Sequence, residues 1–140
     1  MQLTDQLIPQ RAPFVMVDRI TDFGPYYVET AFVVLAGNLL ATNGVLAEAG
    51  VVEHMAQSVA AHTGYAFYLR NEPAPTGYIG VISDMVVERL PAVGDTLCTR
   101  VDILHEFNGV TMVKIATTAN GTAIAAGSMK TVIAQPQQQA

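Results

Sequence analysis

A carboxylate, an imidazole and an amide follow one another in the run Glu53-His54-Met55-Ala56-Gln57, inside a long apolar stretch. A carboxylate is costly to bury in such surroundings unless it has a partner or a function. On a helix, Gln57 lies one turn after Glu53 and on the same face, where its amide can orient the carboxylate. Glu53 and Gln57 are therefore the candidate catalytic residues. The alternative for Glu53 is a structural carboxylate paired at a subunit interface.

The other residues that could bind or react give weaker signals. His54 lies about 100° round the helix from Glu53, which favours an ordinary packed or interface histidine, with substrate binding as its functional alternative. The histidines at 54, 62 and 105 and the single Cys98 lack the spacing of metal ligands, so neither a metal nor a cofactor is expected. One cysteine also excludes an internal disulfide.

Composition limits the kind of protein. The chain has 140 residues, of which 51% are hydrophobic and 14% charged, so a packed core is expected. A net charge of −5 argues against nucleic acid and anionic membranes as partners. The longest low-charge stretch, residues 32–52, contains several polar residues and is a poor membrane span. With no secretory signal at the start, a soluble, cytoplasmic protein is expected, and its low charge predicts burial against another copy.

Hydrophobic patterning predicts one long helix between two groups of strands. The helix covers residues 46–69 and is apolar nearly all round, so it is buried on most sides. Glycine and asparagine residues in 36–44 predict a loop before it. Residues 14–21 and 26–35 form a strand hairpin, and a meander of strands follows at 78–90, 96–107, 110–118 and 122–134.

Two local patterns make the strand predictions specific. Alternation within 96–107 puts one set of residues on the core face of that strand, namely Leu97, Thr99, Val101 and Ile103. Two dipeptides are strong signals for two-residue hairpin turns, Asn108-Gly109 and Asn120-Gly121.

These elements predict an α+β protein in which one antiparallel sheet curls around the long central helix. Residues 1–134 form a single domain. Residues 135–140, Gln-Pro-Gln-Gln-Gln-Ala, form a flexible polar tail.

Three separated motifs resemble a known family. They are the runs Ile8-Pro9-Gln10-Arg11-Ala12-Pro13-Phe14-Val15-Met16-Val17-Asp18-Arg19, Glu53-His54-Met55-Ala56-Gln57 and Arg89-Leu90-Pro91-Ala92-Val93-Gly94-Asp95. In the same order, the beta-hydroxyacyl-acyl-carrier-protein dehydratases of fatty acid synthesis carry runs like L-P-H-R-Y-P-F-L-L-V-D-R, E-A-M-A-Q and R-P-V-V-P-G-D. The resemblance implies a hot-dog fold, a sheet wrapped around one central helix, and an acyl thioester as substrate.

The chain departs from that family at one important position. The family places a catalytic His in G-H-F-P before the helix, whereas the corresponding residues here are Gly37-Asn38-Leu39-Leu40, with Asn38 at the His position. An asparagine amide does not titrate, so Asn38 cannot be a general base. In this respect the chain looks more like the dehydratase-like proteins of aryl polyene type clusters. Asn38 remains a candidate for substrate binding.

Two glycines near the start of the helix are further candidates for substrate binding. Gly44 and Gly50 could let the thioester carbonyl approach backbone N–H groups, which would polarise it. The run Asn43-Gly44-Val45-Leu46 is similar to the P-G-V that leads the family's helix, but it lies about one turn too far from Glu53.

The resemblance implies a 3-hydroxyacyl thioester dehydratase-like protein of fatty acid or aryl polyene type lipid biosynthesis. In the family, the His is the base and the helix carboxylate the acid. Glu53 keeps the carboxylate role, and desolvation of such a group would let it serve as both. The substrate would be carried on acyl carrier protein or coenzyme A. Family members dimerise by joining sheets, so a homodimer or higher oligomer is implied, with residues around Asn38 supplied by the other chain.

Two alternatives stay open at this point. The chain could be a non-catalytic partner subunit that binds acyl chains or supports a second hot-dog subunit carrying the missing His. It could also be an acyl thioesterase, because related hot-dog thioesterases use a helix carboxylate to activate water or to attack the thioester.

Overall fold

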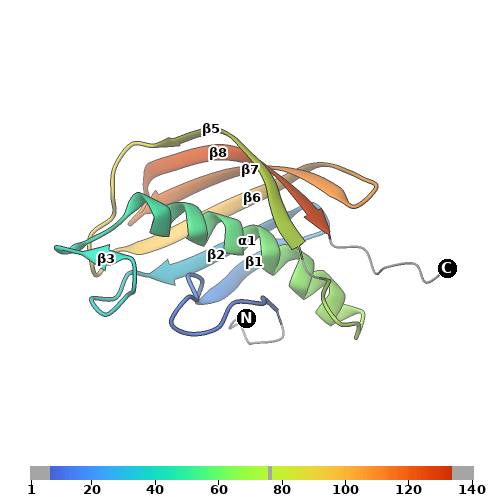
Figure 1. Cartoon of the computed structure of the whole chain (residues 1–140), viewed down its shortest axis with the longest axis horizontal. Coiled ribbons are helices and arrows are strands. Elements are labelled where there is room, and N and C mark those ends of the chain that lie inside the picture. Colours follow the sequence, from blue (N-terminus) through green and yellow to red (C-terminus); the bar gives the residue numbers. More distant parts are fainter. Residues whose placement is uncertain (1–6, 76, 134–140) are drawn as a thin grey trace.

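The computed structural model describes residues 7–75 and 77–133 (Figure 1). One long helix lies against a six-stranded sheet, and a short two-stranded hairpin precedes the helix. In chain order the elements are β1 (Arg19–Gly24), β2 (Tyr27–Val33), β3 (Ala41–Thr42), β4 (Val45–Leu46), α1 (Glu48–Leu69), β5 (Gly77–Val87), β6 (Thr96–Phe107), β7 (Val110–Ala119) and β8 (Thr122–Ile133).

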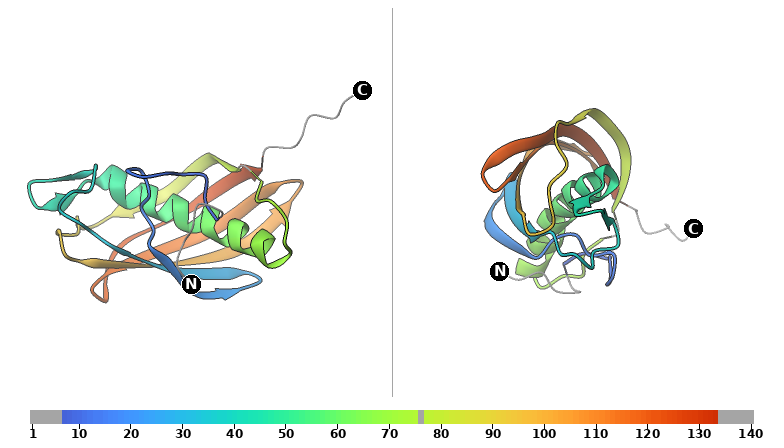
Figure 2. Two further views of the ribbon diagram at one scale, coloured as in Figure 1. Left: turned by 90° about the horizontal axis from the view of Figure 1, so that it is seen from below. Right: turned by 90° about the vertical axis from the view of Figure 1, so that its left-hand side faces the viewer.

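The large sheet is antiparallel throughout, with the strand order β1-β2-β6-β7-β8-β5. It curls around α1, which runs along its concave side (Figures 1 and 2). The predicted α+β arrangement is therefore confirmed. The predicted meander of four strands is correct only for β6, β7 and β8. β5 instead crosses to the far edge and pairs with β8, which places the strand after the helix at the opposite edge from β1.

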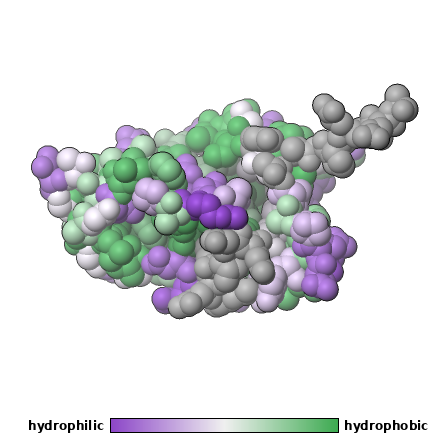
Figure 3. Space-filling view, turned by 60° about the horizontal axis from the view of Figure 1, so that its bottom comes forward, coloured by the Kyte–Doolittle hydropathy of each residue, from purple (hydrophilic) through white to green (hydrophobic). Residues whose placement is uncertain are grey.

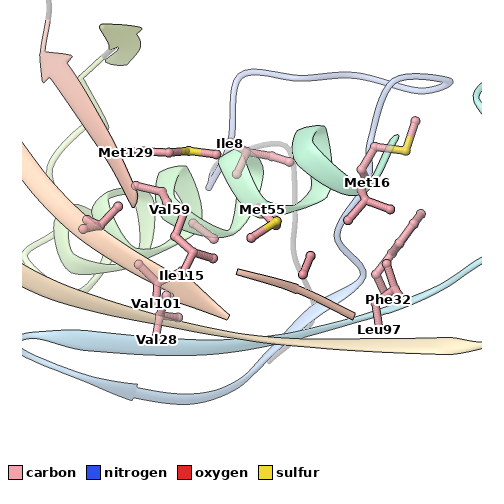
Figure 4. Packing of buried hydrophobic residues seen from close by; sticks show 14 of the residues in the cluster. Ile8, Met16, Val28, Phe32, Met55, Val59, Leu97, Val101, Ile115 and Met129 are labelled. Carbon is pink, nitrogen blue, oxygen red and sulfur yellow. The ribbon is translucent and has the colours of Figure 1, made fainter. Parts of the chain in front are cut away.

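The core lies between the helix and the sheet. Met55 and Val59 on α1 face Val28, Val101 and Ile115 on the strands (Figure 4), and all five are buried. In β6 the residues predicted to face the core are buried or half-buried, and Cys98 on the other face is exposed. That alternation of burial confirms the predicted face of β6.

Three turns are formed by an asparagine followed by a glycine. Asn108 and Gly109 have φ of 51° and 76°, and Asn120 and Gly121 have φ of 49° and 85°, the left-handed conformations that a two-residue hairpin turn requires. Both predicted hairpins are therefore confirmed. A third turn, Asn43-Gly44, joins β3 to β4 inside the segment predicted to be a loop.

Helix α1 begins two residues later than predicted. Leu46 lies in β4, paired with Ala41, and Ala47 is extended at the helix start. The helix ends at Leu69 as predicted, where Asn71 adopts a φ of 58° and stops the helix in a left-handed turn. Near that end, a Cβ added at Gly64 would collide with the backbone oxygen of Leu7, so the N-terminal segment lies directly against the helix.

The first strand is the clearest difference from prediction. A strand was expected over residues 14–21, but β1 starts only at Arg19. Residues 14–16 run beside α1 instead, because their backbone groups bond to helix side chains, Gln57 and His54. The segment that resembled a strand in sequence is therefore part of the candidate site.

Two remaining expectations concern the termini and membranes. The predicted tail, residues 135–140, lies outside the described residues. In the part of the chain that the structure describes, no helix has the length and apolar character needed to cross a membrane.

Candidate active site

Glu53 lies in the second turn of α1 and lines a groove with a volume of about 820 Å³. The groove is lined by residues 7–11, by one face of the helix from Glu53 to Tyr68, by residues 71–75, and by the start of β5 and the end of β8. At 1.5 Å per residue, Glu53 and Tyr68 are separated by roughly 22 Å along the helix axis. The face that carries the N-terminal segment shows hydrophilic residues between hydrophobic areas (Figure 3).

Gln57 holds the Glu53 carboxylate, as the spacing predicted. Gln57 Nε2 donates to Glu53 Oε1 at 2.9 Å and to the backbone oxygen of Phe14 at 2.8 Å, and Gln57 Oε1 accepts from the Met16 N–H at 2.6 Å. The Met16 N–H can only donate, so the orientation of the amide is fixed. Among the described residues, Gln57 is the one hydrogen-bond partner of Glu53, and it uses Oε1. Oε2 forms no hydrogen bond to the described residues.

His54 lies in the core and not in the groove. Its side chain is fully buried and stacks on Phe32 with ring centroids 5.5 Å apart. Nδ1 lies 2.7 Å from the Met16 backbone oxygen, and Nε2 lies 2.7 Å from Thr99 Oγ1. Burial lowers the pKa of His54 to about 4, although the bond to Met16 acts in the opposite direction. With both ring nitrogens occupied, His54 matches the packed alternative and has no atom left for a substrate.

Asn38 does not line the groove that Glu53 lines. The loop residue is half-buried, its Oδ1 accepts from the Leu40 N–H at 2.9 Å, and its Nδ2 lies 3.3 Å from Met16 Sδ. Asn38 contacts the Met16 side chain, whereas Glu53 is connected to Met16 only through Gln57. Within this single chain the two side chains are not brought together in one pocket.

Neither of the two candidate glycines is among the residues that line the groove with Glu53. Gly44 is exposed in the β3–β4 turn, and its oxygen accepts from the Val93 N–H at 2.9 Å. Gly50 is buried in the first turn of α1, where an added Cβ would meet Leu46 at 2.6 Å and Leu40 at 3.2 Å. Close packing explains the glycine at 50, and turn geometry, with φ of 81°, explains the glycine at 44.

Sequence reasoning did not assign two residues that line the groove with Glu53. Arg11 Nη1 donates to the backbone oxygens of Ile8, Pro9 and Gln10 at 2.9–3.0 Å. Gln10 Oε1 is buried and has no hydrogen-bond partner among the described residues. Both belong to the first of the three motifs, and this position is the sequence signal that could have identified them as residues of the site.

No set of three or more His, Cys, Asp or Glu side chains within residues 7–75 and 77–133 is arranged to hold a metal ion. Two carboxylates line the groove, and they differ: Glu72 is paired with Arg70, whereas Glu53 is oriented by the amide of Gln57. Such an arrangement can transfer a proton to or from a bound molecule.

The family comparison covers nearly the whole chain. A family model described as "ApeP-like: ApeP dehydratase" matches residues 3–140. No curated protein matches the chain.

Solved structures match the fold. The dehydratase heterocomplex ApeI:P from Xenorhabdus doucetiae matches with a TM-score of 0.84 at 21% identity, covering 96% of this chain and 91% of that chain. An uncharacterized protein from Pyrococcus horikoshii has a TM-score of 0.72 at 11% identity, covering 98% and 97%. A hypothetical thioesterase with coenzyme A from Streptococcus pneumoniae has a TM-score of 0.60 at 10% identity, covering 86% and 88%. At these identities the likeness is one of fold, the hot-dog fold.

Proposed function

The chain belongs to the ApeP-like dehydratase family, and from this premise we propose that it removes water from a 3-hydroxyacyl thioester carried on acyl carrier protein. The observation that carries this proposal is the Glu53 carboxylate in the groove, held through one oxygen by Gln57. A carboxylate with one oxygen fixed and the other open to a bound chain is suited to proton transfer.

In the proposed reaction, Glu53 acts first as base and then as acid. Glu53 Oε2 takes the proton from the carbon next to the thioester carbonyl, and the carbon–carbon double bond forms. The bond from C3 to its hydroxyl breaks, and the same carboxyl group gives the proton to the departing oxygen, so that water leaves. Gln57 keeps Oε1 in place during both transfers. This sequence needs no second titrating side chain.

A second candidate function is supported by the position of Asn38. Its amide cannot act as a base, and it bonds to Leu40 and Met16 outside the Glu53 groove. In this alternative, the chain is a partner subunit whose site is completed by a second hot-dog protein that carries the His. The solved dehydratase heterocomplex ApeI:P is a precedent for such an assembly.

Either function fits an oligomer joined through β5. This strand is an edge of the sheet, and its apolar side chains Ile79, Val81, Ile82 and Val86 are each more than 40% exposed. A long apolar edge strand is a site for pairing with another chain. The oligomer would be a homodimer, a higher homo-oligomer or an assembly with a second hot-dog subunit.

The test is to incubate the purified chain with a medium-chain 3-hydroxyacyl-acyl carrier protein and to follow the thioester by mass spectrometry. Loss of one water that disappears in Glu53→Gln supports the dehydratase. No water loss by the folded chain alone, with water loss after addition of a G-H-F-P hot-dog subunit, supports the partner function.

Release of the free acid would instead support a thioesterase, the activity named for the Streptococcus pneumoniae protein with the same fold. The same reactions with the coenzyme A thioester identify the carrier. If neither thioester loses water or is hydrolysed under any of these conditions, both enzyme functions are wrong.

A further inference from the structure

His54 stands between Glu53 and Gln57 in sequence but takes no part in the proposed proton transfers. It is nevertheless the most completely bonded imidazole in the described part of the chain. Its two ring nitrogens have partners at 2.7 Å, and its side chain has no exposed surface. A buried polar side chain with every group satisfied is costly to misplace, so it can fix the position of what it contacts.

The donors and acceptors around His54 determine the direction of each bond. The Met16 backbone oxygen can only accept, so Nδ1 carries the hydrogen. The buried imidazole is neutral at pH 7, so Nε2 accepts from the Thr99 hydroxyl. Thr99 Oγ1 in turn accepts from Thr117 Oγ1, 2.6 Å away. The Met16 oxygen therefore selects one tautomer, and the Thr99 hydroxyl on the sheet donates to the nitrogen that this tautomer leaves unprotonated.

The same peptide segment is bonded a second time, on its N–H side. Met16 N donates to Gln57 Oε1 at 2.6 Å, while Met16 O accepts from His54. Gln57 then has only its amino group left, and that group donates to Phe14 O and to Glu53 Oε1. The orientation of the Glu53 carboxylate thus depends on where Met16 lies.

We propose that His54 is a positioning residue, which holds the Met16 peptide against α1 and so keeps the Gln57 amide turned towards Glu53. Residues 14–16 belong to no strand, so no ladder of sheet hydrogen bonds fixes the Met16 backbone, although the Met16 side chain is buried in the core. The next backbone bond from this segment to the sheet is made by Asp18 N to Ala31 O. The part of this inference that concerns turnover rests on the proposed function, whereas the part that concerns the hydrogen bonds does not.

The competing explanation is that His54 only fills the core, and the chain offers a matched control for it. His62, two turns further along α1, is also buried, with 7% exposure. Its Nε2 bonds to the Gly24 backbone oxygen at 2.9 Å, and its ring stacks on Phe23 at 4.9 Å. Within the described part of the chain, His62 forms no hydrogen bond or ring contact with Gln57 or Glu53, so His62→Phe perturbs the core without touching this network.

The test is nuclear magnetic resonance on the full-length chain labelled with nitrogen-15. At pH 7 the His54 ring is expected to show a protonated Nδ1 and an unprotonated Nε2. The side-chain amide hydrogens of Gln57 are expected to exchange with solvent about tenfold faster in His54→Phe, the effect of losing one buried hydrogen bond, and at an unchanged rate in His62→Phe. A ring protonated on Nε2, or equal Gln57 exchange in both variants, overturns the proposal.

If His54→Phe does not fold, a milder variant tests whether His54 positions Gln57. Thr99→Val keeps the shape of the side chain and removes the donor to Nε2, which loosens the imidazole while the Met16 oxygen still keeps the hydrogen on Nδ1. Faster Gln57 exchange is therefore expected, with an unchanged tautomer. Unchanged Gln57 exchange in Thr99→Val overturns the proposal.

Turnover separates this inference from the proposed function. In His54→Phe, kcat for water loss is expected to fall about tenfold with KM nearly unchanged, and neither falls in His62→Phe. Equal kcat values in the two variants overturn the positioning role. If the wild-type chain does not remove water, the proposed function fails, while the exchange rates still decide whether His54 positions Gln57.

Discussion

The two ends of helix α1 each bury a histidine, and they use it differently. His54 stacks on Phe32 and also bonds through both nitrogens, to an irregular segment and to a strand. His62 makes one bond and stacks on Phe23, within a series of aromatic contacts that continues through Tyr65 to Tyr68. Hydrogen bonds fix the orientation of a side chain more tightly than aromatic packing does. The N-terminal half of the helix therefore holds side chains in defined orientations, and the C-terminal half mainly supplies apolar contact.

The largest difference between the two ends should appear in activity. Glu53→Gln keeps the size of the side chain and removes its ability to take a proton, so water loss from a 3-hydroxyacyl thioester is expected to fall roughly 100- to 10,000-fold. Glu106→Gln, a carboxylate change near His62, should leave the rate unchanged. Steady-state rates measured by mass spectrometry check this, and equal losses in the two variants would remove the distinction between the ends.

Stability should separate the two histidines next. His54→Phe leaves the Met16 oxygen and the Thr99 hydroxyl without their buried partner, at a cost of about 2–4 kcal/mol in the free energy of unfolding. His62→Phe loses one bond but keeps its stacking, at a cost of about 1 kcal/mol. Urea denaturation of both variants measures the difference. The comparison would be wrong if His62→Phe were the more destabilised.

The pH dependence of stability should follow the same division. Burial lowers the pKa of His54 from 6.5 to about 4, so the unfolded chain binds the proton more readily than the folded one. The contribution of His54 to the free energy of unfolding is fully present above pH 6.5. As the pH falls towards 4, about 3 kcal/mol of this stability is lost. Burial also lowers the pKa of His62, which acts in the same direction.

Urea denaturation at pH 7 and at pH 4.5 tests this in the wild type and in His54→Phe. Between these two pH values, the free energy of unfolding should fall less in His54→Phe than in the wild type. An equal loss would mean that His54 is already accessible to protons in the folded chain.

The smallest effect is expected at the far end of the helix. Tyr68 is 46% exposed and stacks on Tyr65 with ring centroids 6.0 Å apart. Tyr68→Ala should cost about 1 kcal/mol or less, because a half-exposed aromatic contact contributes little. Thermal unfolding measures it, and a loss as large as that of His54→Phe would show that packing at this end is as critical as the network at the other.

The parts of the fold that sequence predicts well depend on local patterns. The limits of β6, the turns at Asn108-Gly109 and Asn120-Gly121 and the contact between Glu53 and Gln57 follow from period and spacing alone. Each of these is specified by residues at most a few positions apart.

The path of residues 14–16 could not be predicted in this way. Their strand-like composition is overridden by side chains about 40 residues later, because His54 and Gln57 satisfy the backbone groups that a neighbouring strand would otherwise bond. The position of β5 at the far edge and the role of His54 likewise depend on contacts between distant segments. The same long-range contacts build the groove, so its lining by Gln10 and Arg11 was also missed.

The central claim is that Glu53 transfers the protons of a dehydration, and the reverse reaction in oxygen-18 water tests it most directly. The wild-type chain is incubated with a 2-enoyl-acyl carrier protein, and the position of the label is read by mass spectrometry. The account predicts label in a new hydroxyl of the intact thioester with the wild type, and none with Glu53→Gln. Label in a released free acid, or equal labelling of the thioester by Glu53→Gln, would contradict it.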